Sequence, residues 1–288
     1  MHQITKQGEL EKLKIKNQAC SAELFLQGAH LTAWQPKDQM PVLFLSKKSA
    51  FHKGKAIRGG IPLIAPWFGA RTANPLDKRT DGPSHGFART SVWQLIDATT
   101  IGDTTKLVLS LTANENTTSL GYSDCELTLE VELGHKLSLK LSFRNQSAKP
   151  IFIEDAFHSY LAVSDVREIE ISGLKGTTYF DKTDDMKEKV QEEEKLVLKG
   201  ETDRPYIDTT SKIAIEDRVW QRTIHIEKSS SLTTVVWNPW QTLAAKMTDL
   251  EAEEWKDFVC VESANALKNK IRIERGSVHT LETTISVT

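Results

Sequence analysis

Residues 127–143 read LTLEVELGHKLSLKLSF, and this stretch decides the fold class of the 288-residue chain. Apolar and polar residues alternate on both sides of the short Gly134-His135-Lys136 connection. Alternation with a period of two around such a connection predicts a β-hairpin with one buried and one wetted face, as in antiparallel sheets. The predicted buried positions are Leu127, Leu129, Val131 and Leu133 in the first strand and Leu137, Leu139, Leu141 and Phe143 in the second.

Short strand patterns recur along the rest of the chain, and helical patterns do not exceed about two turns. This combination predicts an all-β fold, a large sandwich of antiparallel sheets formed by residues 1–288 as one domain. The further predicted strands lie in residues 22–35, as two strands broken at Gly28, and at 107–111, 151–153, 213, 223–227, 232–237, 259–262, 271–274 and 280–287.

Four segments interrupt the strand patterns. Residues 58–69 (RGGIPLIAPWFG) mix glycines and prolines with large apolar side chains, which predicts a stiff, irregular segment packed against the body. Residues 71–83 are polar and rich in turn residues, so we expect an exposed loop. Residues 181–204 are dominated by charge and predict a solvated loop or short helix, with a brief strand at 196–198. Residues 249–258 predict a polar loop.

The net charge of −2 argues against a global basic field for nucleic acid or an anionic membrane, so any phosphate must be held by a local basic cluster. The three cysteines, Cys20, Cys125 and Cys260, are far apart, which argues against a disulfide framework and a zinc knuckle. The first residues lack the apolar segment of a signal peptide, and the longest apolar run, IPLIAPWF, is too short to span a bilayer. We therefore expect a cytoplasmic monomer with neither nucleic-acid nor membrane partners.

Metal and nucleotide signatures are also missing from the sequence. There is no HExxH, CxxC pair or EF-hand spacing, and no GxGxxG, GxxxxGK[ST] or GxSxG motif. We therefore expect a site that uses neither a metal nor another cofactor.

Two arginines lie beside glycine-bearing turns. Arg58 precedes two glycines, and Arg89 closes the segment SHGFAR, which begins at Ser84 and contains His85. A guanidinium fork suits phosphate, and a histidine can contact a sugar hydroxyl. The structural alternatives are an ordinary surface arginine before a turn, and a loop-to-strand junction whose histidine is satisfied by backbone.

Three titratable residues and an aromatic segment complete the candidates. His158 follows a predicted strand, where a histidine is usually structural. Glu262 ends an apolar strand beside small residues, so it is either exposed or buried with a raised pKa that suits catalysis. Asp203 lies in the charged segment, where a solvated role is the commoner one. Residues 237–240 (WNPW) could line a sugar site or fill the core.

Five segments in this order resemble the aldose 1-epimerase (galactose mutarotase-like) superfamily, and specifically its glucose-6-phosphate 1-epimerase branch. The resemblance runs over nearly the whole chain; each segment is weak alone, but five in order are specific. They read AIRGGIPLIAPWFG (56–69), SHGFAR (84–89), FHSYLAVSD (157–165), VVWNPW (235–240) and VCVESAN (259–265).

The resemblance implies a β-supersandwich and the interconversion of the α and β anomers of glucose 6-phosphate or similar aldohexose 6-phosphates. It implies that His158 is the general acid and Glu262 the general base. The substrate-binding residues that it implies are Arg58 and Arg89, for the phosphate, with Ser84, His85 and Asp203. Relatives often carry Gln where Ser84 stands and Thr where Ser159 stands, which leaves the preferred sugar open.

Mutarotation fits this pair of residues. Ring opening removes a proton from the anomeric O1 and delivers one to the ring oxygen, and closing reverses both transfers. A carboxylate can take the first proton and a histidine can give the second, without a cofactor. Two other classes stay open: a noncatalytic carbohydrate-binding sandwich, and a metal-dependent sugar isomerase that uses the histidines.

Overall fold

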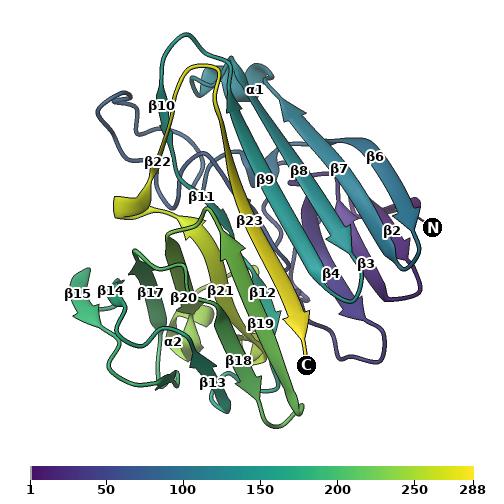
Figure 1. Ribbon diagram of the computed structural model, residues 1–288, viewed down its shortest axis with the longest axis vertical. Helices are drawn as coiled ribbons and strands as arrows, with labels where there is room; N and C mark the ends of the chain where they lie inside the picture. Colours follow the sequence, from purple (N-terminus) through teal and green to yellow (C-terminus); the bar gives the residue numbers. More distant parts are fainter. Residues whose placement is uncertain (1) are drawn as a thin grey trace.

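The computed structural model describes residues 2–288, and within them antiparallel strands form three large sheets (Figure 1). The predicted hairpin is confirmed as β8 (Cys125–Leu133) and β9 (Leu137–Asn145), and its eight predicted core positions are at most 2% exposed. In spatial order, the nine-stranded sheet contains β16 (Lys195–Leu196), β13 (Ile169–Ser172), β18 (Ile213–Asp217), β19 (Arg222–Ser229), β23 (Val278–Val287), β9, β8, β7 (Thr104–Thr112) and β6 (Gln94–Ile101).

A second sheet has eight strands and includes parts of four of the five segments that resembled the family, while SHGFAR (84–89) lies outside it. β11 and β12 lie one after the other along the same edge of β21. In order, the strands are β15 (Lys187–Val190), β14 (Thr178–Asp181), β17 (Thr202–Ile207), β20 (Thr233–Asn238), β21 (Phe258–Asn265), β11 (Asp155–Phe157) and β5 (Leu63–Ile64), with β12 (Tyr160–Ala162) beside β21.

The amino-terminal part forms a four-stranded sheet. Its first strand is polar and largely exposed, so it lacks the apolar alternation from which a strand can be predicted. The strands are β1 (His2–Gln7), β2 (Leu10–Lys16), β3 (Cys20–Phe25) and β4 (His30–Pro36). The remaining elements are the pair β10 (Ile151–Ile153) and β22 (Ile271–Ile273), the helices α1 (Glu115–Ser119) and α2 (Trp240–Ala244), and the 3₁₀ turns η1 (Ala88–Thr90), η2 (Glu254–Asp257) and η3 (Leu267–Asn269).

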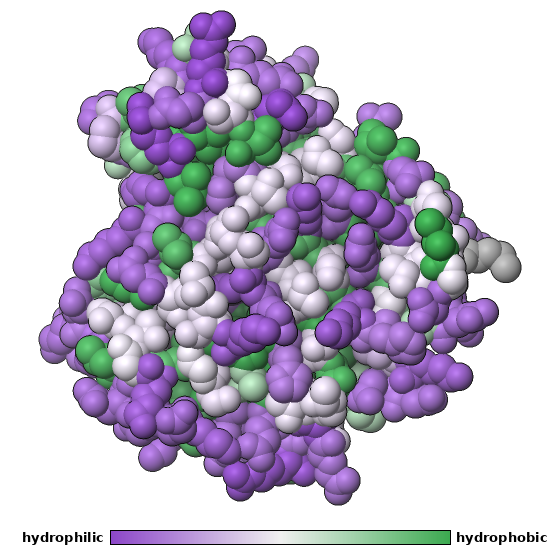
Figure 2. Space-filling model, viewed as in Figure 1, coloured by the Kyte–Doolittle hydropathy of each residue, from purple (hydrophilic) through white to green (hydrophobic). Residues whose placement is uncertain are grey.

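The main core draws on all three large sheets, and the predicted sandwich is thereby confirmed. β21 faces β23 of the nine-stranded sheet, because Ser263 Oγ lies 2.9 Å from Thr283 Oγ1. Successive side chains of a strand point to opposite faces. Glu262 therefore points away from the nine-stranded sheet. The other surface of that sheet carries the polar residues that alternate with the core positions, and Figure 2 shows a mostly hydrophilic face with scattered apolar residues.

The charged segment 181–204 was predicted as a loop or short helix, and this prediction is wrong. It includes β15, β16 and the start of β17, and the brief strand predicted at 196–198 overlaps β16 only at Leu196. Lysines cross-link the carboxylates of neighbouring strands: Lys189 Nζ lies 2.8 Å from Asp181 Oδ2, and Lys182 Nζ lies 3.1 Å from Asp203 Oδ1. Cross-strand ion pairs explain how a run of charge forms strands.

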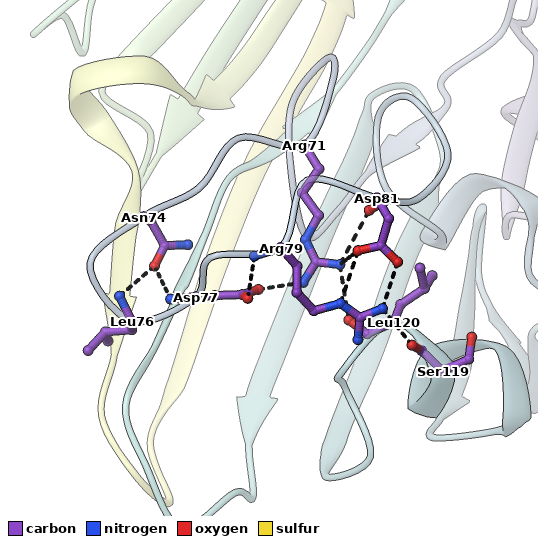
Figure 3. A network of polar contacts seen from close by, with 8 residues as sticks. All are labelled: Arg71, Asn74, Leu76, Asp77, Arg79, Asp81, Ser119 and Leu120. Atoms are coloured by element: carbon purple, nitrogen blue, oxygen red, sulfur yellow. Dashed lines mark hydrogen bonds and ion pairs between the residues drawn. The ribbon is translucent and has the colours of Figure 1, made fainter.

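The loop of residues 71–83 is exposed as predicted, except at its first residue. The Arg71 side chain is only 4% exposed and lies over the rings of Trp67 and Tyr122. Its guanidinium is paired with Asp77 and donates to Leu120 O at 3.1 Å (Figure 3). A buried arginine with this many partners fixes the loop at its base. The polar, turn-rich residues that follow Arg71 concealed this role in the sequence.

Residues 249–258 are not wholly irregular either, because η2 lies within them and β21 begins at Phe258. None of the helices within residues 2–288 is long and apolar enough to cross a membrane. Cys20, Cys125 and Cys260 are buried free thiols. The single domain over residues 1–288 stays a prediction.

Candidate active site

The catalytic candidates lie on the face of the eight-stranded sheet that points away from the nine-stranded sheet. His158 falls at the break between β11 and β12, where its N–H donates to Pro62 O at 3.1 Å. Glu262 lies on β21, whose neighbouring Val261 N–H donates to Ser159 O at 3.2 Å. Backbone bonds on both sides of the break therefore fix His158 opposite Glu262.

A small apolar cluster forms the floor of this face, separate from the main core. Its buried members come from four neighbouring strands and are small or β-branched, which leaves room above them. Phe68 and Trp237 pack against it as partly buried aromatic side chains. The buried members are Ile64, Ala156, Val235 and Ala264.

His158 and Glu262 are in direct contact. Nε2 of His158 lies 3.2 Å from Oε1 of Glu262, and the two side chains are 11% and 1% exposed. The histidine ring stacks on Tyr160 with the ring centres 4.9 Å apart and meets Trp237 edge-on at 6.0 Å. Aromatic contacts on two sides hold the imidazole in one orientation.

Burial acts on both members of the pair. It lowers the pKa of His158 well below its usual value, and the nearby charges of His85, Arg58 and Arg89 act in the same direction. Burial also raises the pKa of Glu262 well above its usual value, and the charge of Asp203 adds to this. Both shifts favour a pair that holds one proton and no net charge.

Two polar atoms of the pair are buried without a partner in the described part of the chain. They are Nδ1 of His158 and Oε2 of Glu262. Buried polar atoms are normally hydrogen-bonded, so free ones in a site identify positions for a ligand.

His85 faces His158 edge-on, with the ring centres 5.9 Å apart. Its Nδ1 accepts a hydrogen bond from the backbone N–H of Gly69 at 3.2 Å. Burial, with the charges of Arg89, Lys182 and Arg58, lowers the pKa of His85 to about 3. The ring is therefore neutral at pH 7 and carries its proton on Nε2, from which it can donate to a ligand.

Arg58 is held by two oxygens from other parts of the chain. Its NH1 donates to the Tyr160 hydroxyl at 2.7 Å, and its Nε and NH2 donate to Oδ2 of Asp249 at 3.2 and 3.0 Å. Because the Tyr160 ring also stacks on His158, one aromatic side chain connects the arginine with the histidine. The two glycines after Arg58 allow close packing of the backbone at this turn.

A Cβ on Gly59 would lie 2.4 Å from Phe44 O, and one on Gly60 would lie 2.3 Å from Leu31 O. These glycines let the turn pack against β4 and the segment that follows it, at φ values of 116° and 62°.

Arg89 is close enough to Arg58 for the two positive charges to repel each other. Its NH2 donates to the carbonyl oxygen of Ser84 at 2.8 Å, while its buried Nε has no partner in residues 2–288. Burial, and beyond it the Arg58 charge, lowers its pKa. Ser84 is exposed and touches Arg89 through its backbone, so a substrate contact from its side chain stays a prediction.

Asp203 lies on β17, directly across from Trp237 of β20, and thus on the same face as Glu262. Burial raises its pKa, and the charge of Lys182 offsets part of this shift. The structure therefore brings Asp203 near the pair, although the charge around it in the sequence favoured a solvated role.

No group of three or more His, Cys, Asp or Glu side chains in residues 2–288 is arranged to hold a metal ion. The geometry joins a buried histidine–carboxylate pair, two arginines and an apolar floor. A family model described as aldose 1-epimerase matches residues 11–286. This chain belongs to the aldose 1-epimerase family.

Relatives of this aldose 1-epimerase family member carry consistent names. A protein of Escherichia coli (strain K12), provisionally named glucose-6-phosphate 1-epimerase, is 33% identical over 90% of this chain and 84% of its own length. A protein of Cenchrus ciliaris with the same provisional name is 32% identical over 93% of this chain and 82% of its own. The crystal structure of a provisionally named mutarotase from Salmonella typhimurium is similar, with a TM-score of 0.92, 30% identity, and coverage of 100% of this chain and 93% of that one.

Several neighbours of the site were missed in the sequence. Tyr160 and His158 are two residues apart, so strand periodicity could have placed them on one face. Trp237 had been left open between core and site, and it contacts both the floor and His158. Lys182 and Asp249 lie in polar segments where no periodicity distinguishes them.

Proposed function

We propose that this protein interconverts the α and β anomers of glucose 6-phosphate, and also acts on similar aldohexose 6-phosphates. The observation that carries the proposal is the 3.2 Å separation of His158 Nε2 and Glu262 Oε1. The two oxygens that exchange protons in mutarotation, O1 and the ring oxygen, are bonded to the same carbon. Their proton-transfer partners must therefore lie close together, as these two atoms do.

The proton count of the pair suits the reaction. The buried pair holds one proton, and its passage from Glu262 to His158 gives a carboxylate and an imidazolium. The carboxylate takes the proton from O1 while the imidazolium protonates the ring oxygen, and the C1–O5 bond breaks. The aldehyde then rotates, and the reverse transfers close the ring on its other face. The pair ends in its starting state.

The phosphate is assigned to Arg58 and Arg89. The charges of both guanidinium groups lower the pKa of His158, and Arg58 is bonded to Tyr160, whose ring stacks on His158. Charge-assisted hydrogen bonds to phosphate contribute roughly 1.5–3 kcal/mol each. His85 and Asp203 would contact the sugar hydroxyls, His85 as a donor from Nε2 and Asp203 as an acceptor.

Kinetics of Arg58→Ala and Arg89→Ala test the phosphate assignment. Each variant should raise KM for glucose 6-phosphate by about tenfold or more while changing free-glucose mutarotation little. Arg58→Lys and Arg89→Lys should rescue only in part, because a point charge lacks the planar fork. Equal losses on both sugars would show that the arginines hold the fold or the ring instead.

We also propose a cytoplasmic monomer without nucleic-acid partners. The net charge of −2 supports the absence of nucleic-acid binding. Light scattering on the purified chain tests the oligomeric state, and an assay in excess chelator tests whether the activity needs a metal.

A further inference from the structure

Asp249 occupies one edge of the arginine that the proposed function assigns to phosphate. Its Oδ2 alone accepts from both Nε and NH2 of Arg58, at 3.2 and 3.0 Å. This edge of a guanidinium is one that carboxylates and phosphates use. We propose that Asp249 is a specificity-determining residue, a fixed counter-charge that weakens the site for phosphate; the inference rests on the phosphate role proposed for Arg58.

The contacts of Arg58 leave limited room for a phosphate. Each of its three nitrogens already donates to a protein oxygen, of Asp249 or of Tyr160, so NH1 and NH2 keep one further N–H each. A phosphate that binds these two groups lies beside the Asp249 carboxylate. A phosphate that takes the Nε edge must displace that carboxylate. In both cases the phosphate dianion meets a like charge.

The backbone of Asp249 is anchored on one side, which restricts the positions that its side chain can take. Its neighbour Leu250 is 1% exposed and belongs to the main core. Two residues from Asp249, Glu251 N–H donates to Oε2 of Glu254 at 2.9 Å. The ion pair is also partly sheltered, with the side chains of Arg58 and Asp249 24% and 36% exposed.

The local charges show why this carboxylate matters. Lys182 is paired with Asp203, and Arg58 is paired with Asp249. Within this set, Arg89 is the cation whose side chain pairs with a carbonyl oxygen instead of a carboxylate. Removal of the Asp249 charge would double the positive charge available to phosphate.

Two substitutions separate charge from orientation. Asp249→Asn removes the charge and keeps an oxygen that can accept from Arg58. Tyr160→Phe removes the hydrogen bond to NH1, keeps the ring on His158 and leaves the charge unchanged. Asp97→Asn, at an exposed position of β6 in the nine-stranded sheet, repeats the charge change as a matched control.

The readouts are the KM for glucose 6-phosphate, the inhibition constant of inorganic phosphate, and kcat/KM for glucose 6-phosphate divided by that for glucose. Asp249→Asn should lower this KM and the inhibition constant by about three- to tenfold and should raise the kcat/KM ratio. The effect should be smaller at high salt. Tyr160→Phe removes no charge, so it should lower neither the KM nor the inhibition constant, and Asp97→Asn should change none of the three readouts.

Weaker or unchanged phosphate binding in Asp249→Asn, with normal thermal unfolding, would overturn the proposal and leave Asp249 as a residue that orients Arg58. Arg58→Ala separates this failure from that of the proposed function. If Arg58→Ala leaves phosphate inhibition unchanged, the phosphate role of Arg58 is wrong and the inference falls with it. If Arg58→Ala abolishes inhibition while Asp249→Asn does not strengthen it, only the inference is wrong.

Discussion

Two buried histidine–carboxylate pairs lie on opposite faces of the eight-stranded sheet. His158 is 3.2 Å from Glu262 on the outer face, and His279 is 3.0 Å from Asp155 between the sheets. The histidine side chains are both 11% exposed, and the carboxylates are 1% and 2% exposed. Distance and burial therefore do not distinguish the two pairs.

Their surroundings do distinguish them. The second pair is part of the structure between β11, β21 and β23, where Asn265 donates to Asp155 Oδ1 at 2.9 Å and to Ser230 O at 2.8 Å. The first pair lies within the charges of Arg58 and Arg89, above an apolar floor, with an unpartnered atom on each member. A buried pair becomes a candidate site when its neighbours leave it atoms and charge for a ligand.

The largest effect is expected at the outer pair. His158→Asn and Glu262→Gln should each lower the mutarotation rate by about 10²–10⁴-fold, because each removes a proton-transfer group. An assay coupled to an anomer-specific dehydrogenase measures the rate, and thermal unfolding checks the fold. Near-full activity in either well-folded variant would remove that residue from the mechanism.

A third buried histidine contacts a carbonyl instead of a carboxylate and should respond to pH. His30 Nε2 lies 2.7 Å from Gly59 O, and burial lowers its pKa to about 4. The unfolded chain then binds the proton first as pH falls. Its contribution to stability is complete above about pH 6.5 and is lost towards pH 4, by about 3 kcal/mol in total.

Denaturant unfolding at pH 7.5 and pH 5 measures this loss, and His30→Gln should lose less stability than the wild type between them. Other buried histidines contribute to the wild-type slope, so the difference between the two proteins is the relevant quantity. An equal loss in both proteins would mean that His30 is not the group that titrates.

The inner pair should affect stability instead of turnover. Asp155→Asn should lower the free energy of unfolding by about 1–3 kcal/mol, since it removes the charge beside His279. The folded variant should keep most of its activity, because the substituted side chain points away from the site. A loss of rate comparable to that of Glu262→Gln would break the distinction between the two pairs.

Substitution of Lys228 should have the smallest effect on stability, and it should stabilise the protein instead of destabilising it. Its Nζ is buried without a partner in residues 2–288, on the face of β19 that carries Ile224 and Ile226, and burial lowers its pKa to about 7. The cost of charging it is absent above its usual pKa and accumulates as pH falls from 10.5 to 7. Lys228 is only partly buried, so solvent screening reduces this cost, and Lys228→Met should stabilise the protein at pH 7 by roughly 1–2 kcal/mol. A smaller gain at pH 10 is expected, and destabilisation at pH 7 would contradict the buried-charge interpretation.

The sequence predicted the elements in which one face is apolar. The β8–β9 hairpin and the break at Gly28 followed from alternation, and the irregular course of residues 58–69 followed from glycine and proline. β1 and β15 were missed because they are polar and largely exposed, although each pairs with the strand next to it in the sequence, β2 and β14, through a short turn.

The candidate site was predictable only in part. The roles of His158, Glu262 and the two arginines came from the resemblance, while spacing alone favoured structural roles for His158 and the arginines and left Glu262 either exposed or buried for catalysis. The partners that define their chemistry come from distant segments: Asp249 reaches Arg58 across 191 positions, and no local pattern connects the two. The difference between the two histidine–carboxylate pairs is likewise a property of packing.

Exchange NMR at anomeric equilibrium tests the proposed activity most directly. With wild-type protein, α- and β-glucose 6-phosphate should exchange much faster than in buffer, with a smaller acceleration for free glucose, and Glu262→Gln should return the rate nearly to that of buffer. Asp155→Asn should retain the acceleration. Exchange at the buffer rate with the wild-type protein, or full acceleration with Glu262→Gln, would contradict a mutarotase that works through His158 and Glu262.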